Sequence, residues 1–238
     1  MTLTVHPRFR GPATSGNGGY VAGRLAARIG TGPVTVTLRS PPPLDVPLDV
    51  TSDASGVSVF NGDTLVATTG EGDASLLDTV EPASVDDARA ASDHYPGFET
   101  HPFPECFVCG PQRSPGDGMR LFPGRLGDGR TACVWDVTAE TSGQPVFVWA
   151  ALDCPSGWSA PIEGRPMVLG RMTAQVDDVP GDGEACVVMG LYLQTEGRKT
   201  WTRSAAYGHD GRLLGRAHAT WIALPENPIA PGASGRIP

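Results

Sequence analysis

Long apolar runs and clusters of basic residues are both missing from this 238-residue sequence. No stretch approaches the roughly eighteen apolar residues that cross a bilayer, and the first ten residues lack the apolar core of a signal peptide. We therefore expect a cytoplasmic protein without a membrane partner. The 18 basic residues, among which Lys199 is the sole lysine, are scattered singly, and the net charge is −8. This pattern argues against a nucleic-acid partner, because no basic stripe is present to neutralise phosphates.

Cysteine is also scarce, and a serine-hydrolase motif is absent. Five cysteines at irregular spacing fit reduced thiols better than a disulfide framework. The sequence contains no Gly-x-Ser-x-Gly elbow, which disfavours a Ser-His-Asp hydrolase of that kind. Glycine and proline are plentiful, with 31 and 23 residues, and they indicate many turns between short elements of a globular chain.

The order of expected elements is similar in the two halves of the chain. A glycine-rich turn at residues 15–19 leads into a helix at 18–30, and alternating apolar residues predict strands at 34–38, 46–50, 57–60 and 64–67. Asn61-Gly62 favours a tight hairpin turn. The second half predicts a strand at 130–137, a helix within 147–160, and strands at 167–176, 185–193, 199–207 and 213–222, with a hairpin turn at Asp210-Gly211.

These patterns predict an α+β fold with an internal repeat, in which each unit wraps an antiparallel sheet around one central helix. We place the first unit at residues 1–71 and the second at 106–225. A polar linker at 72–105 separates the units, and a tail follows at 226–238.

Three motifs carry a family resemblance. They are Asn17-Gly18-Gly19 at the start of the first helix, Cys106-Phe-Val-Cys109-Gly110, and Asp153 within the second helix. Together they resemble the acyl-CoA thioesterase-like hotdog proteins. The resemblance implies a double hotdog that hydrolyses an acyl thioester of coenzyme A or of a carrier protein. It further implies no metal or redox cofactor, and a possible homodimer formed through the hotdog sheets.

The resemblance also implies a role for individual residues. Asp153 would be the general base or the carboxylate nucleophile, and the backbone N–H groups of Gly18 and Gly19 would stabilise the oxyanion, since they lie at the positive end of a helix. Asn17 would add a side-chain donor. Substrate contacts are assigned to Tyr20 and Ser156.

The two halves carry complementary parts of this apparatus. The first helix has Ala26 where the family places an acid, eight residues after Gly18. The second helix has the acid, but Pro145, eight residues before Asp153, has no N–H group to donate. We therefore expect a composite site built from both helices.

Alternatives remain open for Asp153 and for the whole protein. Because Pro155 is unfavourable inside a helix, Asp153 could instead cap a turn that restarts there. The chain could also be a non-catalytic acyl-binding or scaffold protein that retains the fold. A hydratase is less well supported, because the related hydratases use an aspartate and a histidine a few residues apart and no histidine follows Asp153 before His209.

Cys106 and Cys109 raise the question of zinc, with His101 five residues upstream. A structural zinc site needs four ligands, commonly two pairs, and the sequence has no second Cys-x-x-Cys or His pair. The other three cysteines are isolated in the sequence. We therefore expect no metal and interpret the pair as turn residues.

Overall fold

The computed structural model describes residues 1–54 and 56–225, so the expected tail at 226–238 lies outside the described residues. The α-helices are α1 (Gly18–Ala26), α2 (Val85–Ser92) and α3 (Pro145–Trp158), and short 3-10 helices lie at Pro7–Phe9, Ala74–Leu76 and Pro96–Phe98. The strands are β1 (Thr2–Leu3), β2 (Val34–Leu38), β3 (Leu48–Asp53), β4 (Gly56–Asn61), β5 (Thr64–Glu71), β6 (Gly124–Arg125), β7 (Arg130–Asp136), β8 (Met167–Val176), β9 (Ala185–Glu196), β10 (Lys199–Tyr207) and β11 (Leu213–Ala223).

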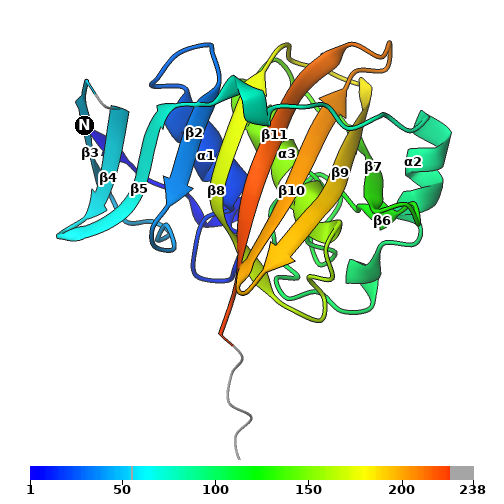
Figure 1. Cartoon of the computed structure of the whole chain (residues 1–238), viewed down its shortest axis with the longest axis horizontal. Helices are drawn as coiled ribbons and strands as arrows, with labels where there is room; N and C mark the ends of the chain where they lie inside the picture. Colours follow the sequence, from blue (N-terminus) through cyan, green and yellow to red (C-terminus); the bar gives the residue numbers. More distant parts are fainter. Residues whose placement is uncertain (55, 226–238) are drawn as a thin grey trace, which may run out of the picture.

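All of these strands belong to one antiparallel sheet. Its order is β1-β3-β4-β5-β2-β8-β11-β10-β9-β7-β6, so the strands of the first half occupy one end and those of the second half the other (Figure 1). The halves meet where β2 pairs with β8, with Val34 opposite Ala174. An antiparallel sheet with few helices is the α+β class expected from the sequence.

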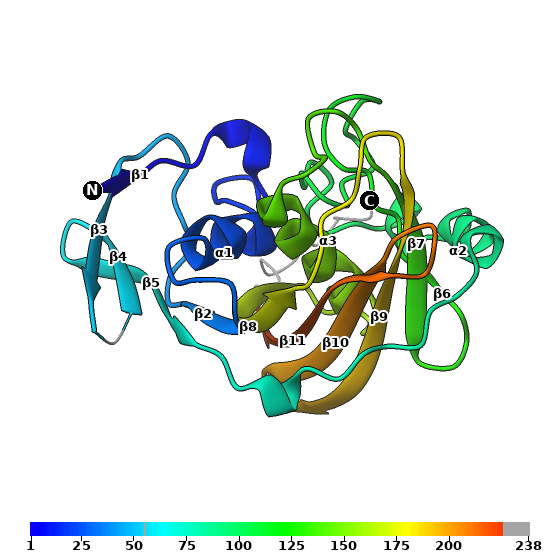
Figure 2. The same ribbon diagram turned by 90° about the horizontal axis from the view of Figure 1, so that it is seen from above.

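The sheet curves around α1 and α3, which lie next to each other on one of its faces (Figure 2). α3 begins with Pro145 at its first turn, where the missing N–H group costs little. It is apolar on nearly every side, and residues 147–158 are all buried. A helix that is apolar all round fits a central position between a sheet, a second helix and covering loops.

The segment expected to link the units contains α2 and packs onto the second half. The Ser84 side chain caps α2 by accepting a hydrogen bond from the Asp87 N–H group. Ala88 of α2 is fully buried, in a cluster with the β7 residues Ala132 and Val134. The intervening residues of β7 face the main core instead, so both faces of this strand are covered.

Two details of the elements differ from the sequence expectation. α1 ends at Ala26, earlier than residue 30, because glycines and a proline follow at 30–33. The β4–β5 hairpin turns one residue later than expected, since Asn61 pairs with Thr64 and Gly62 adopts a φ of 57°. Among the helices of residues 1–54 and 56–225, none has the length and apolarity needed to cross a membrane.

Candidate active site

Two glycines allow α1 to approach α3 closely. Gly19 and Gly23 lie four residues apart, so they share one face of α1. A Cβ atom at Gly19 would lie 2.5 Å from Asp153 Cβ, and one at Gly23 would lie 2.8 Å from Trp149 Cβ. Real Cβ atoms do not approach so closely, so the helix contact depends on both glycines.

This contact places the Asp153 carboxylate against the start of α1. Asp153 is 2% exposed, and its Oδ2 accepts hydrogen bonds from the Gly19 N–H and from Asn17 Nδ2, each at 2.9 Å. Asn17 is the N-cap of α1, and its Oδ1 accepts from the Tyr20 N–H at 2.9 Å. The other carboxylate oxygen, Oδ1, is buried and has no hydrogen-bond partner among the described residues.

Burial raises the pKa of Asp153 to about 7. The hydrogen bond from the Gly19 N–H group stabilises the charged form and lowers the pKa. The nearby Cys106 sulfur raises the pKa, and the hydrogen bond from the Asn17 amide lowers it. A carboxyl group with this pKa can accept a proton and return it near neutral pH.

The helix α3 continues through Pro155 to Trp158. Proline removes the backbone donor to the carbonyl oxygen four residues earlier, that of Ala151, and side-chain hydroxyls donate to three other carbonyl oxygens of this part of the helix. The donors are Ser204 to Leu152 O at 2.6 Å, Ser156 to Asp153 O at 2.9 Å, and Thr131 to Pro155 O at 2.7 Å. The helix is therefore not broken, and the interpretation of Asp153 as the cap of a restarted turn is wrong.

Replacing Thr131 by valine is expected to reduce the free energy of unfolding by about 1–3 kcal/mol, the penalty for leaving a buried carbonyl oxygen without its donor. Thr131 is fully buried, and valine keeps its shape while removing the hydroxyl. Urea unfolding followed by circular dichroism measures the change. Thr131→Ser retains the hydroxyl and serves as the control, and equal stability of Thr131→Val and the wild type would contradict this account of the helix.

A cavity of about 320 Å³ opens beside Asp153. Its lining is mainly apolar, and the large apolar side chains include Phe103, Trp158, Ile162, Met167, Leu169 and Trp221. Asn17 and Gly18 line it from the start of α1. Asp153 and Arg39 are the charged residues of this lining.

The two residues assigned to substrate contacts are instead placed in the core. The Tyr20 ring stacks on Phe9 with ring centroids 4.0 Å apart. The Ser156 hydroxyl lies between the helix backbone and the Trp221 indole, which donates to it at 3.3 Å. Both residues are outside the cavity lining, so the expectation that they contact substrate is not supported by their positions.

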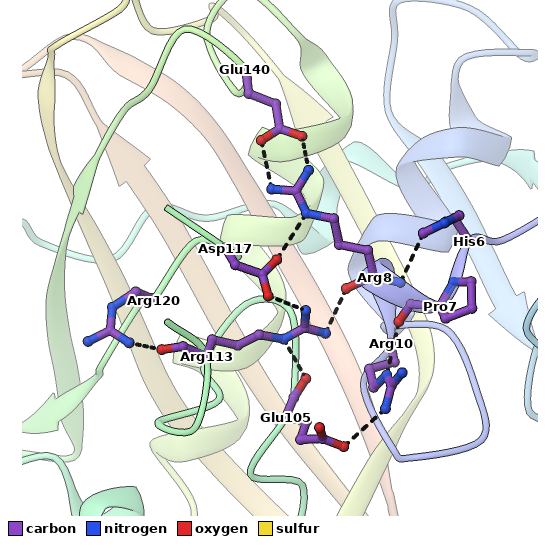
Figure 3. Close-up of polar contacts among 9 residues, drawn as sticks. All are labelled: His6, Pro7, Arg8, Arg10, Glu105, Arg113, Asp117, Arg120 and Glu140. Carbon is purple, nitrogen blue, oxygen red and sulfur yellow. Dashed lines mark hydrogen bonds and ion pairs between the residues drawn. The ribbon is translucent and has the colours of Figure 1, made fainter. Parts of the chain in front are cut away.

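A polar network holds the loop of Cys106 and Cys109 against the N-terminal segment (Figure 3). Arg8 donates to Asp117 at 3.0 Å, and Arg113 donates to the other oxygen of the same carboxylate at 3.0 Å. The Phe107 N–H group also donates to Arg10 O at 2.7 Å. These bonds fix the loop next to the turn that precedes α1.

The loop meets α3 at a cluster of three cysteines. The sulfur atoms of Cys106, Cys109 and Cys154 all lie within 4.8 Å of one another, and Cys106 Sγ is 3.7 Å from Cys154 Sγ. Sequence spacing missed this cluster because Cys106 and Cys154 are 48 residues apart. The argument that Cys154 is isolated, on which the expectation of no metal rests, therefore does not hold in the fold.

Comparison with solved structures assigns the fold. The chain superimposes on a hot dog fold protein of unknown function from Alicyclobacillus acidocaldarius with a TM-score of 0.63 and 13% identity, covering 94% of this chain and 92% of that one. The chain has the hotdog fold. A proposed thioesterase from Novosphingobium aromaticivorans gives a TM-score of 0.62 and 12% identity, and the match covers 93% of this chain and 94% of that one.

A third similar structure is the TesB protein of Mycobacterium avium subspecies paratuberculosis, with a TM-score of 0.59 and 12% identity, and the match covers 94% of this chain and 92% of that one. No protein-family model and no curated protein matches the sequence. At this identity the comparisons establish the hotdog fold, and the function has to be argued from the site.

Proposed function

We propose that the protein is a double hotdog thioesterase that hydrolyses a small acyl thioester in the cavity lined by the start of α1 and by α3. Residues 1–71 would form the unit around α1, and residues 106–225 the unit around α3. Residues 72–105 would connect them and cover β7. The observation that carries the proposal is the Asp153 carboxylate, which is buried at the cavity with one oxygen fixed and the other unpartnered.

In this mechanism Asp153 acts as the general base. Oδ2 is anchored by the Gly19 and Asn17 donors, so Oδ1 is the atom available to take a proton from water. The resulting hydroxide adds to the thioester carbonyl carbon. The tetrahedral intermediate then collapses, the C–S bond breaks, and the thiolate leaves with the proton returned by Asp153. In the variant in which Asp153 is the nucleophile, Oδ1 adds to the carbonyl carbon and the C–S bond breaks to release the thiolate. Water then hydrolyses the resulting mixed anhydride, which frees the acid and restores Asp153.

Gly18 is the proposed oxyanion donor. It is the first residue of α1 and lines the cavity, and the first N–H groups of a helix have no intrahelical acceptor and lie at its positive end. The Gly19 N–H group, also assigned to the oxyanion from the sequence, donates to Asp153. We therefore assign Gly19 and Asn17 to the positioning of the base.

The cavity favours a small acyl group. Its volume of about 320 Å³ lies at the lower end of the range for ligand pockets, and its apolar lining suits a hydrocarbon or aromatic chain. Arg39 is exposed and lines the same cavity, where a cation favours the phosphates of coenzyme A.

A thiol-release assay over acetyl, butyryl, benzoyl, octanoyl and palmitoyl coenzyme A tests this function. We expect turnover with the short and benzoyl substrates and at least about tenfold lower kcat/KM with palmitoyl coenzyme A, since each 1.4 kcal/mol of lost binding is a factor of ten. Equal kcat/KM across all five would contradict the assignment of the acyl group to this cavity. Absence of thiol release from every substrate would contradict the hydrolase.

A non-catalytic acyl-binding protein is the second candidate. The observation that favours it is the Gly19 N–H group, which is already engaged by Asp153 and so leaves one fewer donor for an oxyanion. Binding of acyl coenzyme A in calorimetry without thiol release would support this candidate over the thioesterase.

A further inference from the structure

The three-cysteine cluster has the arrangement of a metal-binding site. Cys106 and Cys109 come from one turn, and Cys154 comes from α3, directly after Asp153. All three side chains are buried, and all three line the cavity. The 3.7 Å between the sulfur atoms of Cys106 and Cys154 matches the edge of a tetrahedron whose Zn–S bonds are about 2.3 Å.

The Asn17 side-chain amide lies beside two of the three sulfur atoms. Asn17 Nδ2 is 3.7 Å from the sulfur of Cys106 and 3.8 Å from the sulfur of Cys154. Such N–H···S contacts orient thiolate ligands and stabilise their negative charge.

The sulfur of Cys109 lies beside the His101 ring. The Phe103 N–H group donates to His101 Nδ1 at 2.8 Å, so in the neutral ring the proton is on Nε2. That nitrogen lies 3.4 Å from Cys109 Sγ and therefore donates to the sulfur. His101 consequently acts as a donor to a ligand and is not itself the fourth ligand.

A cation is the partner that three buried thiolates would need, because several buried negative charges are costly without a positive charge in contact with them. Within residues 1–54 and 56–225, no lysine or arginine side chain bonds to the three sulfur atoms. Soft thiolate ligands select zinc among the common divalent ions of proteins.

We propose that Cys106, Cys109 and Cys154 bind one Zn²⁺ ion as thiolates, with the fourth coordination position directed to the cavity. Binding releases the proton of each thiol that is protonated beforehand, and no redox change occurs. The ion ties the Cys106–Cys109 turn to α3. Three protein ligands and one open position characterise zinc sites that accept an exogenous ligand.

Metal analysis of the full chain, purified without chelator and without added metal, tests this proposal independently of any activity. We expect about one equivalent of zinc per chain in the wild type and in Cys133→Ser, whose thiol is buried against β9 away from the cavity. In Cys109→Ser we expect a loss of most of the zinc. A stoichiometric zinc content that survives in Cys109→Ser overturns the site.

Cobalt substitution keeps the proposal testable if Cys109→Ser does not fold. Chelator-treated wild type titrated with Co²⁺ should develop a sulfur-to-cobalt charge-transfer band that saturates at one equivalent and is displaced by Zn²⁺. The proposal is overturned if the wild type carries no zinc as purified and binds Co²⁺ without this band.

Discussion

Replacing Asp153 by asparagine is expected to lower kcat for thioester hydrolysis by about two to four orders of magnitude, the range for removal of a general base. The asparagine oxygen can take the place of Oδ2 and accept from the Gly19 and Asn17 donors. The amide nitrogen then takes the place of Oδ1, so the atom that would accept the water proton is lost. Because the shape and the anchoring bonds are retained, we expect a change of only a few degrees in Tm.

The matched control is Asp136→Asn, which removes a carboxylate from an exposed ion pair with Arg89 outside the cavity lining. We expect its kcat to stay within about twofold of the wild type, as surface ion pairs contribute little. Thiol release from the best substrate and thermal unfolding are measured for both variants. Turnover of Asp153→Asn within a few-fold of the wild type would remove Asp153 from the mechanism.

The sequence was sufficient to predict the class of the fold and the two helices of the site. Alternation of apolar residues located the longer strands, because each has one face on the core. It did not locate α2, since only Ala88 and Ala91 of this short, polar helix are buried. A helix stabilised mainly by tertiary contacts with β7 leaves a weak periodic signal.

The details of the site that the sequence did not predict depend on contacts between residues far apart in the chain. Beside Pro155, carbonyl oxygens of α3 accept from the hydroxyls of Thr131 in β7 and Ser204 in β10, and these distant donors cannot be assigned without the fold. The pairing of Gly19 with Asp153 spans 134 residues. The motif therefore pointed to the segments that meet at Asp153, while the proposed division between donors to the base and donors to the oxyanion required the fold.

Replacing Gly19 by alanine is expected to reduce the free energy of unfolding by about 1–3 kcal/mol, the usual penalty for overpacking, and to lower turnover as well. The new methyl carbon would lie 2.5 Å from Asp153 Cβ and 2.7 Å from the Trp149 carbonyl oxygen. Both are rigid parts of α3, so α1 must move away. The helix preference of alanine over glycine, about 1 kcal/mol, is too small to offset this.

Displacement of α1 would also lengthen the bond from the Gly19 N–H group to Asp153 Oδ2, which is 2.9 Å in the wild type, so the base would lose one of its two anchors. Gly32→Ala is the control, because a Cβ atom at Gly32 has no neighbour within 4 Å among the described residues and is tolerated. Urea unfolding and thiol release are measured for both variants. If Gly19→Ala is as stable and as active as Gly32→Ala, the close contact of α1 with α3 is not what positions Asp153.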